Sequence, residues 1–505
     1  MKLRNGITIL AGLFIASFVS TAKQPNIIFI LADDLGWQDV GFMGSQYFET
    51  PYLDALAQES LVFENAFMYP TCSPSRAAIL TGQQSFRTGC YTVPVLEKGK
   101  AADNIFSKWT VGEEHAVFSQ PLSEAGYKLI HLGKWHIVGP NPESEATYPF
   151  KKKLGQPGNG DLSWLAVHKT PEIQKYYPLG RGFDENVGGT WWGDPARGYK
   201  QGYNALGGGY VAPFKNPFIQ DKEDDGWLTD RLTDDAIDFM IRHTRSAGSG
   251  QAGQPFFVNL HYYAPHRPSV ARSDELQAHF MDKAGDPSTG QGLGNKKKEV
   301  ADYATMIKSI DDNVKRILDY LDESELRENT VIVFTSDNGF NGLQSSNKNL
   351  RGAKGNVYDG GLRVPMLLNW PHKVKVGRNK TAVQGLDLFP TFLELAGISD
   401  YPGTLDGDSW VPLMLGEAFA ERPIFWHIAS TYRDPPCSIV RKGKWKLIQY
   451  LKEGRVELYD TEMDLKESRN LVKSHPEKVD RLLEDLIAWR KSNKVPLPPS
   501  SILEY

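Results

Sequence analysis

The clearest pattern along the chain is a set of short, continuous apolar runs separated by segments of helical periodicity. The runs span Asn26–Ala32, Tyr127–Leu132, Phe256–His261 and Thr330–Ser336. Apolar runs of this length, rich in β-branched residues, are typical of strands buried on both faces of a sheet. Strands that alternate with helices predict an α/β fold, with a large, mostly parallel sheet flanked by helices. In such sheets ligands bind beyond the carboxyl ends of the strands.

The strongest helical pattern comes just before the last of these runs. Its apolar positions recur every three or four residues and form one stripe. They are Val300, Tyr303, Ile307, Ile310, Val314, Ile317 and Leu321. This stripe predicts a long helix that packs on the sheet.

The pattern changes after about residue 415, where short strand-like runs are joined by Lys-Gly and Glu-Gly turns. The expected strands are Ser438–Arg441, Trp445–Tyr450 and Arg455–Tyr459. An amphipathic helix follows over roughly Pro476–Lys491. We therefore predict a small α+β C-terminal subdomain with an antiparallel sheet at residues 416–505, after a large domain at residues 23–415.

The first residues resemble a secretory signal peptide. Lys2 and Arg4 precede an apolar stretch, Ile7–Val19, that is too short to span a membrane, and Ser20–Ala22 offers small residues for cleavage. We predict a signal peptide at residues 1–22 and export to the bacterial periplasm or the exterior. No later stretch approaches the length of a membrane span.

Composition narrows the functional classes. The 505 residues are 40% hydrophobic and 23% charged, with a formal net charge of −4. A nucleic-acid-binding protein is expected to carry a basic surplus, so we expect no nucleic-acid partner. An anionic substrate would have to be met by a local basic pocket. Of the three cysteines, Cys90 and Cys437 allow one bridge if Cys72 has another role, and the sequence leaves that bridge open.

The segment from about residue 139 to 225 has little strand or helix periodicity but is rich in Gly, Trp, Tyr and Pro. Trp191 and Trp192, with Arg197 and Lys200 nearby, would suit an anionic sugar. The alternative is that the aromatic rings simply pack the segment against the sheet. An exposed platform and a buried anchor look alike in sequence.

Two polar pairs directly follow apolar runs. Asp33 and Asp34 follow the first run, and Asp337 and Asn338 follow the last. One such pair alone is more often a turn or a helix cap, but two at equivalent strand ends indicate a shared site. Carboxylate and amide oxygens are the ligands of hard divalent cations, whereas no cluster of His and Cys with zinc spacing is present.

The stretch Thr71–Gly82 places Cys72 four residues before Arg76 and ends in Thr-Gly. A lone cysteine is more often a buried structural thiol, but this order resembles the signature of the type I sulfatases, C-x-P-S-R followed by T-G. The resemblance implies an alkaline-phosphatase-like fold and a maturation enzyme that oxidises Cys72 to formylglycine, an aldehyde that hydrates to a geminal diol. It also implies one bound Ca²⁺; Mg²⁺ is the alternative, less favoured by a cage made only of protein oxygens. The implied ligands are Asp33, Asp34, Asp337, Asn338 and the modified Cys72.

Further motifs extend the resemblance over nearly the whole mature chain. Lys134 and His136 lie in a G-K-W-H element, His266 in A-P-H-x-P, and Lys354 in R-G-A-K-G. By resemblance, Arg76 and the cation hold the diol while Lys134 and Lys354 stabilise the sulfuryl oxygens. His266 would protonate the leaving oxygen, and His136 would deprotonate the second hydroxyl. Each residue alone would more often be structural or solvated, but a pocket that stabilises charge needs several converging groups.

The sequence therefore predicts a sulfuric ester hydrolase acting on a sulfated carbohydrate. We prefer an algal galactan such as carrageenan over a glycosaminoglycan or an aryl sulfate as the substrate. The reasons are the aromatic insert at residues 139–225 and the export signal. Two other classes stay open: a phosphodiesterase or phosphonate hydrolase of the same superfamily, and an inactive carbohydrate-binding homologue. The G-K-W-H and R-G-A-K-G elements favour sulfate, and the intact Cys72 and metal ligands argue against an inactive homologue. The sulfate position and the oligomeric state are left open.

Overall fold

The computed structural model describes residues 24–139, 168–195, 209–245, 253–283, 296–341 and 349–503. The predicted signal peptide at residues 1–22 lies outside the described residues, as do Arg197 and Lys200. Within the described part of the chain, no helix is long and apolar enough to cross a membrane.

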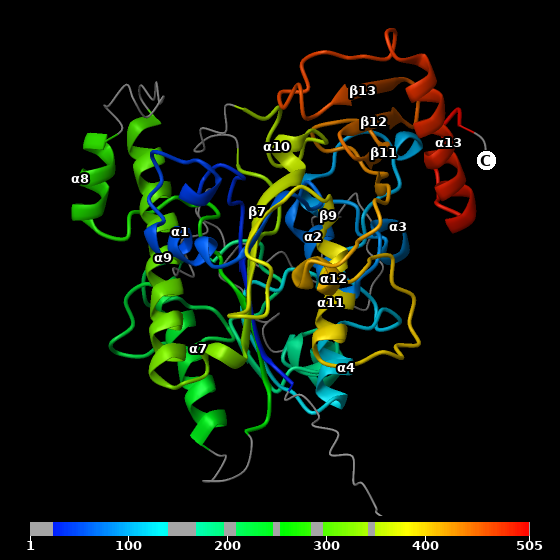
Figure 1. Cartoon of the computed structure of the whole chain (residues 1–505). Helices are drawn as coiled ribbons and strands as arrows, with labels where there is room; N and C mark the ends of the chain where they lie inside the picture. Colours follow the sequence, from blue (N-terminus) through cyan, green and yellow to red (C-terminus); the bar gives the residue numbers. More distant parts are fainter. Residues whose placement is uncertain are drawn as a thin grey trace, which may run out of the picture.

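A large sheet runs through the centre of the molecule (Figure 1). Over the described residues it has nine strands in the order β4-β3-β5-β1-β6-β7-β2-β8, with β9 beside β2. Its strands are β1 (Asn26–Ala32), β2 (Leu61–Phe67), β3 (Lys128–Gly133), β4 (Glu185–Val187), β5 (Phe256–His261), β6 (Thr330–Ser336), β7 (Arg363–Asn369), β8 (Gly377–Asn379) and β9 (Val383–Gln384). Only β7 runs antiparallel to its neighbours in this described sheet. The predicted large, mostly parallel sheet is confirmed. Strands β1, β5 and β6 match their predicted ranges, and β3 is shifted by one residue.

Helices cover both faces of the sheet. The α-helices are α1 (Pro51–Gln58), α2 (Cys72–Thr81), α3 (Ser85–Thr88), α4 (Ser119–Glu124), α6 (Pro171–Gln174), α7 (Leu228–Arg245), α8 (Asp274–Lys283), α9 (Lys297–Glu323), α10 (Asp359–Leu362), α11 (Leu388–Leu395), α12 (Val411–Leu415) and α13 (Pro476–Asn493). Figure 1 shows α1, α7, α8 and α9 on one face and α2, α4, α11 and α12 on the other.

The alternation of side chains along β1 explains the two layers. Ile28 and Ile30 pack in the core under α7 and α9, whereas Ile27, Phe29 and Leu31 pack in the core under α2 and α11. Because both faces are buried, the strand reads as a continuous apolar run. The predicted stripe lies on α9, and all its residues are buried in the first of these cores.

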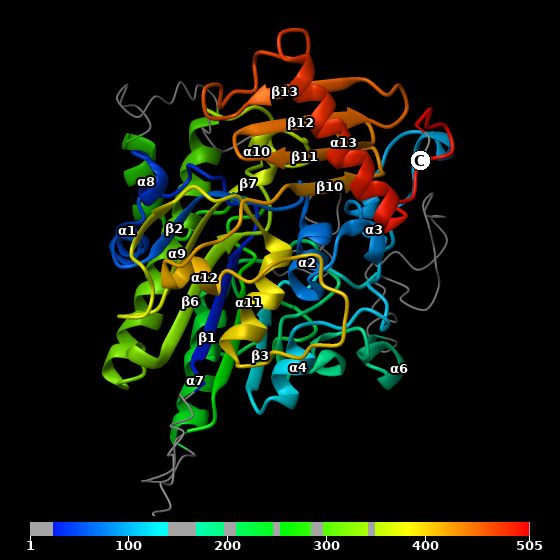
Figure 2. The same ribbon diagram turned by 45° about the vertical axis from the view of Figure 1, so that its right-hand side comes forward.

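The C-terminal residues form a second, antiparallel sheet above the first (Figure 2). Its strands are β10 (Ile424–Ile428), β11 (Cys437–Lys442), β12 (Trp445–Tyr450) and β13 (Val456–Asp460). One face packs on α13, through Leu482 and Leu486. The other face packs on Phe67 and Leu362 of the large domain. The predicted antiparallel sheet and final helix are confirmed, whereas β10 was not expected. The domain boundary after residue 415 stays a prediction.

A buried group of charges joins the two sheets, and we call it the junction cluster. It consists of Asp359, Arg363, Arg441, Lys446 and Glu467. Asp359 Oδ1 and Glu467 Oε1 both accept hydrogen bonds from Lys446 Nζ, at 2.8 and 2.7 Å. Asp359 Oδ2 accepts from the two arginines, and Glu467 Oε2 accepts from the Asp359 amide.

Candidate active site

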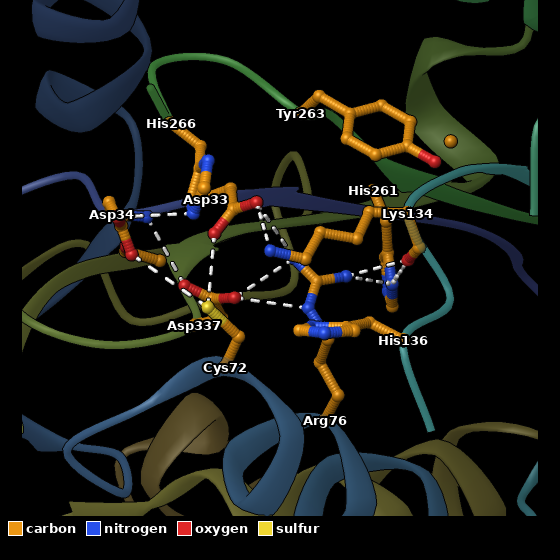
Figure 3. Close-up of polar contacts among 12 residues, drawn as sticks. Asp33, Asp34, Cys72, Arg76, Lys134, His136, His261, Tyr263, His266 and Asp337 are labelled. Atoms are coloured by element: carbon orange, nitrogen blue, oxygen red, sulfur yellow. Dashed lines mark hydrogen bonds and ion pairs between the residues drawn. The ribbon is translucent and has the colours of Figure 1, made fainter. Parts of the chain in front are cut away.

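Four neighbouring parallel strands end at one edge of the central sheet, in the order β3-β5-β1-β6. The predicted site residues follow these ends. They are Lys134 and His136 after β3, His266 after β5, Asp33 and Asp34 after β1, and Asp337 and Asn338 after β6. The structure brings them together with Cys72, Arg76 and Lys354, so that residues more than 300 positions apart are in contact. Figure 3 shows the polar contacts among most of these side chains.

The acidic side of the site consists of the two loops that follow β1 and β6, which are hydrogen-bonded to each other. The Asp34 amide donates to Asp337 Oδ1 at 3.2 Å, and Asn338 Nδ2 donates to Asp34 Oδ1 at 2.8 Å. Asp34 has a positive φ of 67°, which is uncommon outside glycine and turns the chain sharply after β1. Asp33, Asp34, Asp337 and Asn338 have no exposed surface.

Cys72 is the first residue of α2, so its side chain is held at the N-terminus of a buried helix. The helix follows Thr71, which is extended, and ends at Gly82, whose positive φ of 64° closes the last turn. Cys72 Sγ lies 3.4 Å from Asp33 Oδ1, 3.8 Å from Asp34 Oδ1 and 3.0 Å from Lys354 Nζ. The side chain therefore points into the acidic cluster.

Three cations neutralise this cluster. Lys134 Nζ lies 2.5 Å from Asp33 Oδ2, and Lys354 Nζ lies 2.6 Å from Asp34 Oδ1. Arg76, one helical turn after Cys72, donates from Nε to Asp337 Oδ2 at 3.0 Å and from a terminal nitrogen to the Lys134 carbonyl at 2.6 Å. Arg76 thus ties α2 to the loops after β6 and β3.

The donor set fits a hard divalent cation. Among the described residues, ligand atoms of Asp33, Asp34, Cys72 and His266 lie within 4.8 Å of one another. Asp34 Oδ2 and Asn338 Oδ1 are buried without a hydrogen-bond partner, although buried acceptors are nearly always paired. Unpaired oxygens beside further carboxylates are what an oxygen-coordinated ion requires. The predicted set includes Asp337 and Asn338 and leaves out His266, and this set stays a prediction.

Charges and burial shift the acid–base properties of the site in different directions. Burial raises the pKa of Asp34, but the neighbouring Lys354, followed by His266 in its protonated form and Lys134, outweighs burial and holds the pKa below its usual range. Burial and the charge of Asp33 raise the pKa of Asp337 to about 6. Burial, followed by the charge of Asp337, raises the pKa of the Cys72 thiol. The unmodified thiol is therefore protonated at neutral pH and is a poor nucleophile.

The two predicted histidines lie on opposite sides of the site (Figure 3). His136 has a positive φ of 60°, and its Nδ1 is buried without a hydrogen-bond partner. Burial and Lys134 lower its pKa. His266 Nδ1 lies 2.7 Å from the Arg267 carbonyl, so Nδ1 carries a proton, and Nε2 lies 3.7 Å from Asp34 Oδ2. Burial, followed by Lys134, lowers the pKa of His266 to about 3.

Two further residues of the site were not predicted. His261 is the last residue of β5, and its Nδ1 lies 3.2 Å from Arg76. Tyr263, two residues later, donates a hydrogen bond from its hydroxyl to the Gly188 carbonyl at 3.0 Å. The sequence indicates only part of this, because His261 ends a predicted strand at the sheet edge where Asp33 was expected to lie, but nothing in the sequence indicates its contact with Arg76. His261 orients Arg76 from the side opposite Asp337 (Figure 3).

The predicted sugar platform has a different environment. Trp191 and Trp192 are only 4% and 3% exposed and belong to the same core as Trp135. Their burial favours the alternative that these rings pack the insert against the sheet. A direct role for them in holding a sugar stays a prediction. Cys72, Cys90 and Cys437 are all free and buried, so the bridge left open by the sequence is not formed.

Comparison with known protein families shows which family the chain is related to. A family profile described as Sulfatase matches residues 25–398. The chain belongs to the sulfatase family. A second profile, described as N-sulphoglucosamine sulphohydrolase, C-terminal, matches residues 353–492 of this sulfatase. The resemblance to sulfatases is thereby confirmed.

Individual relatives cover most of the chain. A sulfatase of Formosa agariphila is 27% identical over 97% of this chain and 94% of its own length. The N-acetylgalactosamine-6-sulfatase of Canis lupus familiaris is 30% identical over 84% of this chain and 71% of its own. The crystal structure of Ps i-CgsB is 28% identical with a TM-score of 0.70, covering 95% of both chains. The protein is a sulfuric ester hydrolase that acts on sulfate esters of carbohydrates.

Proposed function

We propose that this sulfatase removes sulfate from an algal galactan of the carrageenan type, using formylglycine formed from Cys72 and one bound Ca²⁺. One observation carries the catalytic part: Cys72 Sγ lies 3.0 Å from Lys354 Nζ and within 3.8 Å of two carboxylates. In the unmodified chain this sulfur stands in for one oxygen of the hydrated aldehyde. We also propose export by the signal peptide at residues 1–22 and oxidation of Cys72 by a maturation enzyme.

The two groups supply distinct chemistry. When formed, the hydrated aldehyde supplies an oxygen that attacks sulfur and a second hydroxyl that later expels sulfate. When bound, the calcium ion lowers the pKa of the attacking hydroxyl and draws charge from the sulfuryl oxygens. Asp33, Asp34, Asp337 and Asn338 would hold that ion. Arg76 donates hydrogen bonds to the Asp337 carboxylate and to the Lys134 carbonyl, so it holds a proposed metal ligand and a proposed catalytic lysine in fixed positions.

The side chains around this centre take the remaining roles. Lys134 and Lys354 stabilise the sulfuryl oxygens as negative charge shifts toward the leaving oxygen. His266 gives the leaving alkoxide a proton from Nε2, and an anionic substrate favours the protonated imidazole required for this step. His136 accepts the proton from the second hydroxyl at position 72. The overall reaction consumes one water and yields an alcohol and hydrogen sulfate.

The choice of substrate rests on similarity to proteins of known structure or known activity. A solved structure of Ps i-CgsB in complex with k-i-k-neocarrahexaose is 27% identical to this chain with a TM-score of 0.70 over 95% of both chains. This similarity supports a carrageenan-type glycan. A glycosaminoglycan is the second candidate, favoured by the 30% identity to the canine N-acetylgalactosamine-6-sulfatase.

The experiment is a parallel assay of the purified mature chain. An aryl sulfate, an aryl phosphodiester, carrageenan oligosaccharides and chondroitin 6-sulfate oligosaccharides are compared, and the peptide around Cys72 is weighed by mass spectrometry. We expect formylglycine at position 72 and release of sulfate from the aryl sulfate and the carrageenan oligosaccharides. Turnover of the phosphodiester alone would overturn the sulfatase mechanism. Release from chondroitin alone would move the substrate to the second candidate.

A further inference from the structure

We propose that Lys98, Tyr432 and Arg433 form an anion-binding subsite beside the active site, which takes a second sulfate or carboxylate group of the glycan. The inference rests on the proposed function, because it needs a substrate with more than one negative charge. We call these three residues the cationic subsite. Tyr432 and Arg433 are neighbours in the chain, whereas Lys98 lies more than 300 positions before them and meets them only in the fold.

The two cations of the subsite share one aromatic ring. Lys98 Nζ lies 5.5 Å from the centroid of the Tyr432 ring, and the Arg433 guanidinium carbon lies 5.7 Å from the same centroid. Lys98 and Arg433 are exposed, and Tyr432 is half-buried. Both groups add positive charge around the same ring, and this charge attracts an anion to its neighbourhood.

Within the described residues, neither Lys98 nor Arg433 has a carboxylate within 4.0 Å. The acids next to them in the chain face other groups. Glu97 Oε1 accepts from the Ser107 amide and the Ser430 hydroxyl, both at 2.6 Å. Asp434 Oδ2 accepts from Asn356 Nδ2 and the Val357 amide, at 3.0 and 2.8 Å. The positive charge of the subsite is therefore left for a ligand.

The subsite is built onto the loop that carries Lys354. Gly355 packs so closely on Tyr432 that a Cβ there would lie 2.4 Å from the ring atom Cε1. The Gly355 amide donates to the Pro70 carbonyl at 2.6 Å, two residues before Cys72. The same loop places Lys354 Nζ 3.0 Å from Cys72 Sγ. Tyr432 is thus a direct neighbour of the turn that positions a predicted catalytic lysine.

A second segment connects the subsite to the other side of Cys72. The Lys98 amide donates to the Thr431 carbonyl at 2.8 Å, and Asn104 Oδ1 accepts from the Thr431 amide at 2.6 Å. Six residues before Lys98, Thr92 Oγ1 lies 3.3 Å from Thr71 Oγ1. The segment from Thr92 to Lys98 therefore runs from the residue next to Cys72 to the cations. Backbone held in this way presents a preorganised surface.

The chemistry of the subsite suits a sugar with its own charge. Lysine and arginine donate charge-assisted hydrogen bonds to sulfate and carboxylate oxygens. The Tyr432 ring offers an apolar face against which a sugar ring can pack. The second anion has two sources, a sulfate ester on the neighbouring sugar or the carboxylate of a uronic acid, and a substrate comparison separates them.

The test measures competition against aryl sulfate hydrolysis, since this readout does not require that the oligosaccharide itself is cleaved. The probes are a carrageenan hexasaccharide with sulfate on neighbouring sugars and a chondroitin 6-sulfate tetrasaccharide with a uronate beside the sulfated sugar. The double variant Lys98→Ala with Arg433→Ala is compared with the native chain. A matched control, Arg469→Ala with Lys473→Ala, removes the same charge from exposed positions on the C-terminal subdomain.

We expect the double variant to hydrolyse aryl sulfate normally and to raise the inhibition constant of at least one probe roughly tenfold, with a smaller difference at high salt. The probe that is affected identifies the anion. An unchanged inhibition constant for both probes, or a change equal to that of the control, overturns the subsite. So does a native chain that neither probe inhibits. If neither aryl sulfate nor any of the oligosaccharides is hydrolysed, the proposed function fails. Calorimetric binding of the same probes decides the subsite whenever aryl sulfate is not hydrolysed.

Discussion

The molecule holds two buried clusters of charge that look alike in composition and differ in how their oxygens are paired. In the junction cluster, each oxygen of Asp359 and Glu467 accepts at least one hydrogen bond. In the active site, Asp34 Oδ2 and Asn338 Oδ1 have none. Burying an unpaired acceptor costs free energy, so a fold tolerates it where a ligand supplies the missing partner. The difference distinguishes a cluster that holds two layers together from one that we propose to bind a cation and to react.

The balance of charge also differs. Three carboxylates face three cations in the active site, so that the cluster is neutral in itself. Its members are Asp33, Asp34, Asp337, Arg76, Lys134 and Lys354. A bound divalent cation would make the site positive, which is the sign that an anionic sulfate ester requires. The junction cluster already has three cations for two carboxylates and needs no further ion.

The largest expected effect is a loss of turnover without a loss of stability, on substitution of Cys72. Cys72→Ala should lower aryl sulfate turnover by about 10⁴-fold or more, because the nucleophile is lost. The melting temperature should stay within a few degrees of the native value. Cys90→Ala, which removes another buried thiol, is the control and should keep full activity. Turnover within tenfold of native in Cys72→Ala would refute formylglycine as the nucleophile.

The junction cluster should show the opposite behaviour. Lys446→Met leaves Asp359 and Glu467 buried without their shared cation, which should lower the free energy of unfolding by about 3–5 kcal/mol. At a temperature where the variant is folded, its kcat on aryl sulfate should be native. Lys442→Met, which breaks an exposed pair with Asp485, is the control and should cost less than about 1 kcal/mol. Urea unfolding and steady-state kinetics on the same samples make the comparison.

Glu97 sharpens the comparison, because it is a buried acid with no cation bonded to it. Burial raises its pKa from an ordinary value of 4.5 to about 7, and its Oε2 has no hydrogen-bond partner. The raised pKa contributes stability that is complete below pH 4.5 and is lost as the pH rises through 7. This contribution is about 3 kcal/mol. Glu97→Gln should remove that part of the pH dependence, as measured by urea unfolding at pH 5 and pH 8.

Calcium should stabilise the folded protein by binding at the active-site cluster, which has unpaired oxygens, and not at the junction cluster. Calcium at 100 times its Kd should raise the free energy of unfolding by about 2.7 kcal/mol, and a chelator should reverse the gain and abolish turnover. Asp337→Asn should lose both responses, whereas Lys446→Met should keep the stabilisation. Thermal unfolding with and without calcium checks the pair. A calcium shift that survives Asp337→Asn would place the ion elsewhere.

Much of the sheet could be predicted, because its strands are buried on both faces. The runs that became β1, β5 and β6 are continuous and apolar, and their ends could be read to the residue. The short strands β4 and β8 were missed, since three residues give no periodicity. β10 was missed because no turn motif precedes it. The role of the aromatic segment could not be predicted, because the sequence does not show whether Trp191 is buried or exposed.

The site was predictable wherever a residue directly followed a strand or belonged to a specific motif. Asp33, Lys134 and Asp337 were expected at one sheet edge and lie there. The contact of His261 with Arg76 depends on the register between β5 and β1, which the sequence does not carry. The cationic subsite depends on a meeting of two loops, around Lys98 and Tyr432, that no local pattern encodes.

The burial of Cys72 has a consequence for the order of events during synthesis. In the folded chain this residue is 1% exposed and enclosed by Asp33, Asp34 and Lys354. An enzyme that oxidises the thiol cannot reach it there without opening the central sheet edge. The oxidation that we propose would therefore have to occur while the chain is still unfolded, before Cys72 is buried. A host that folds the chain faster than it oxidises it would produce a stable, well-packed and inactive population.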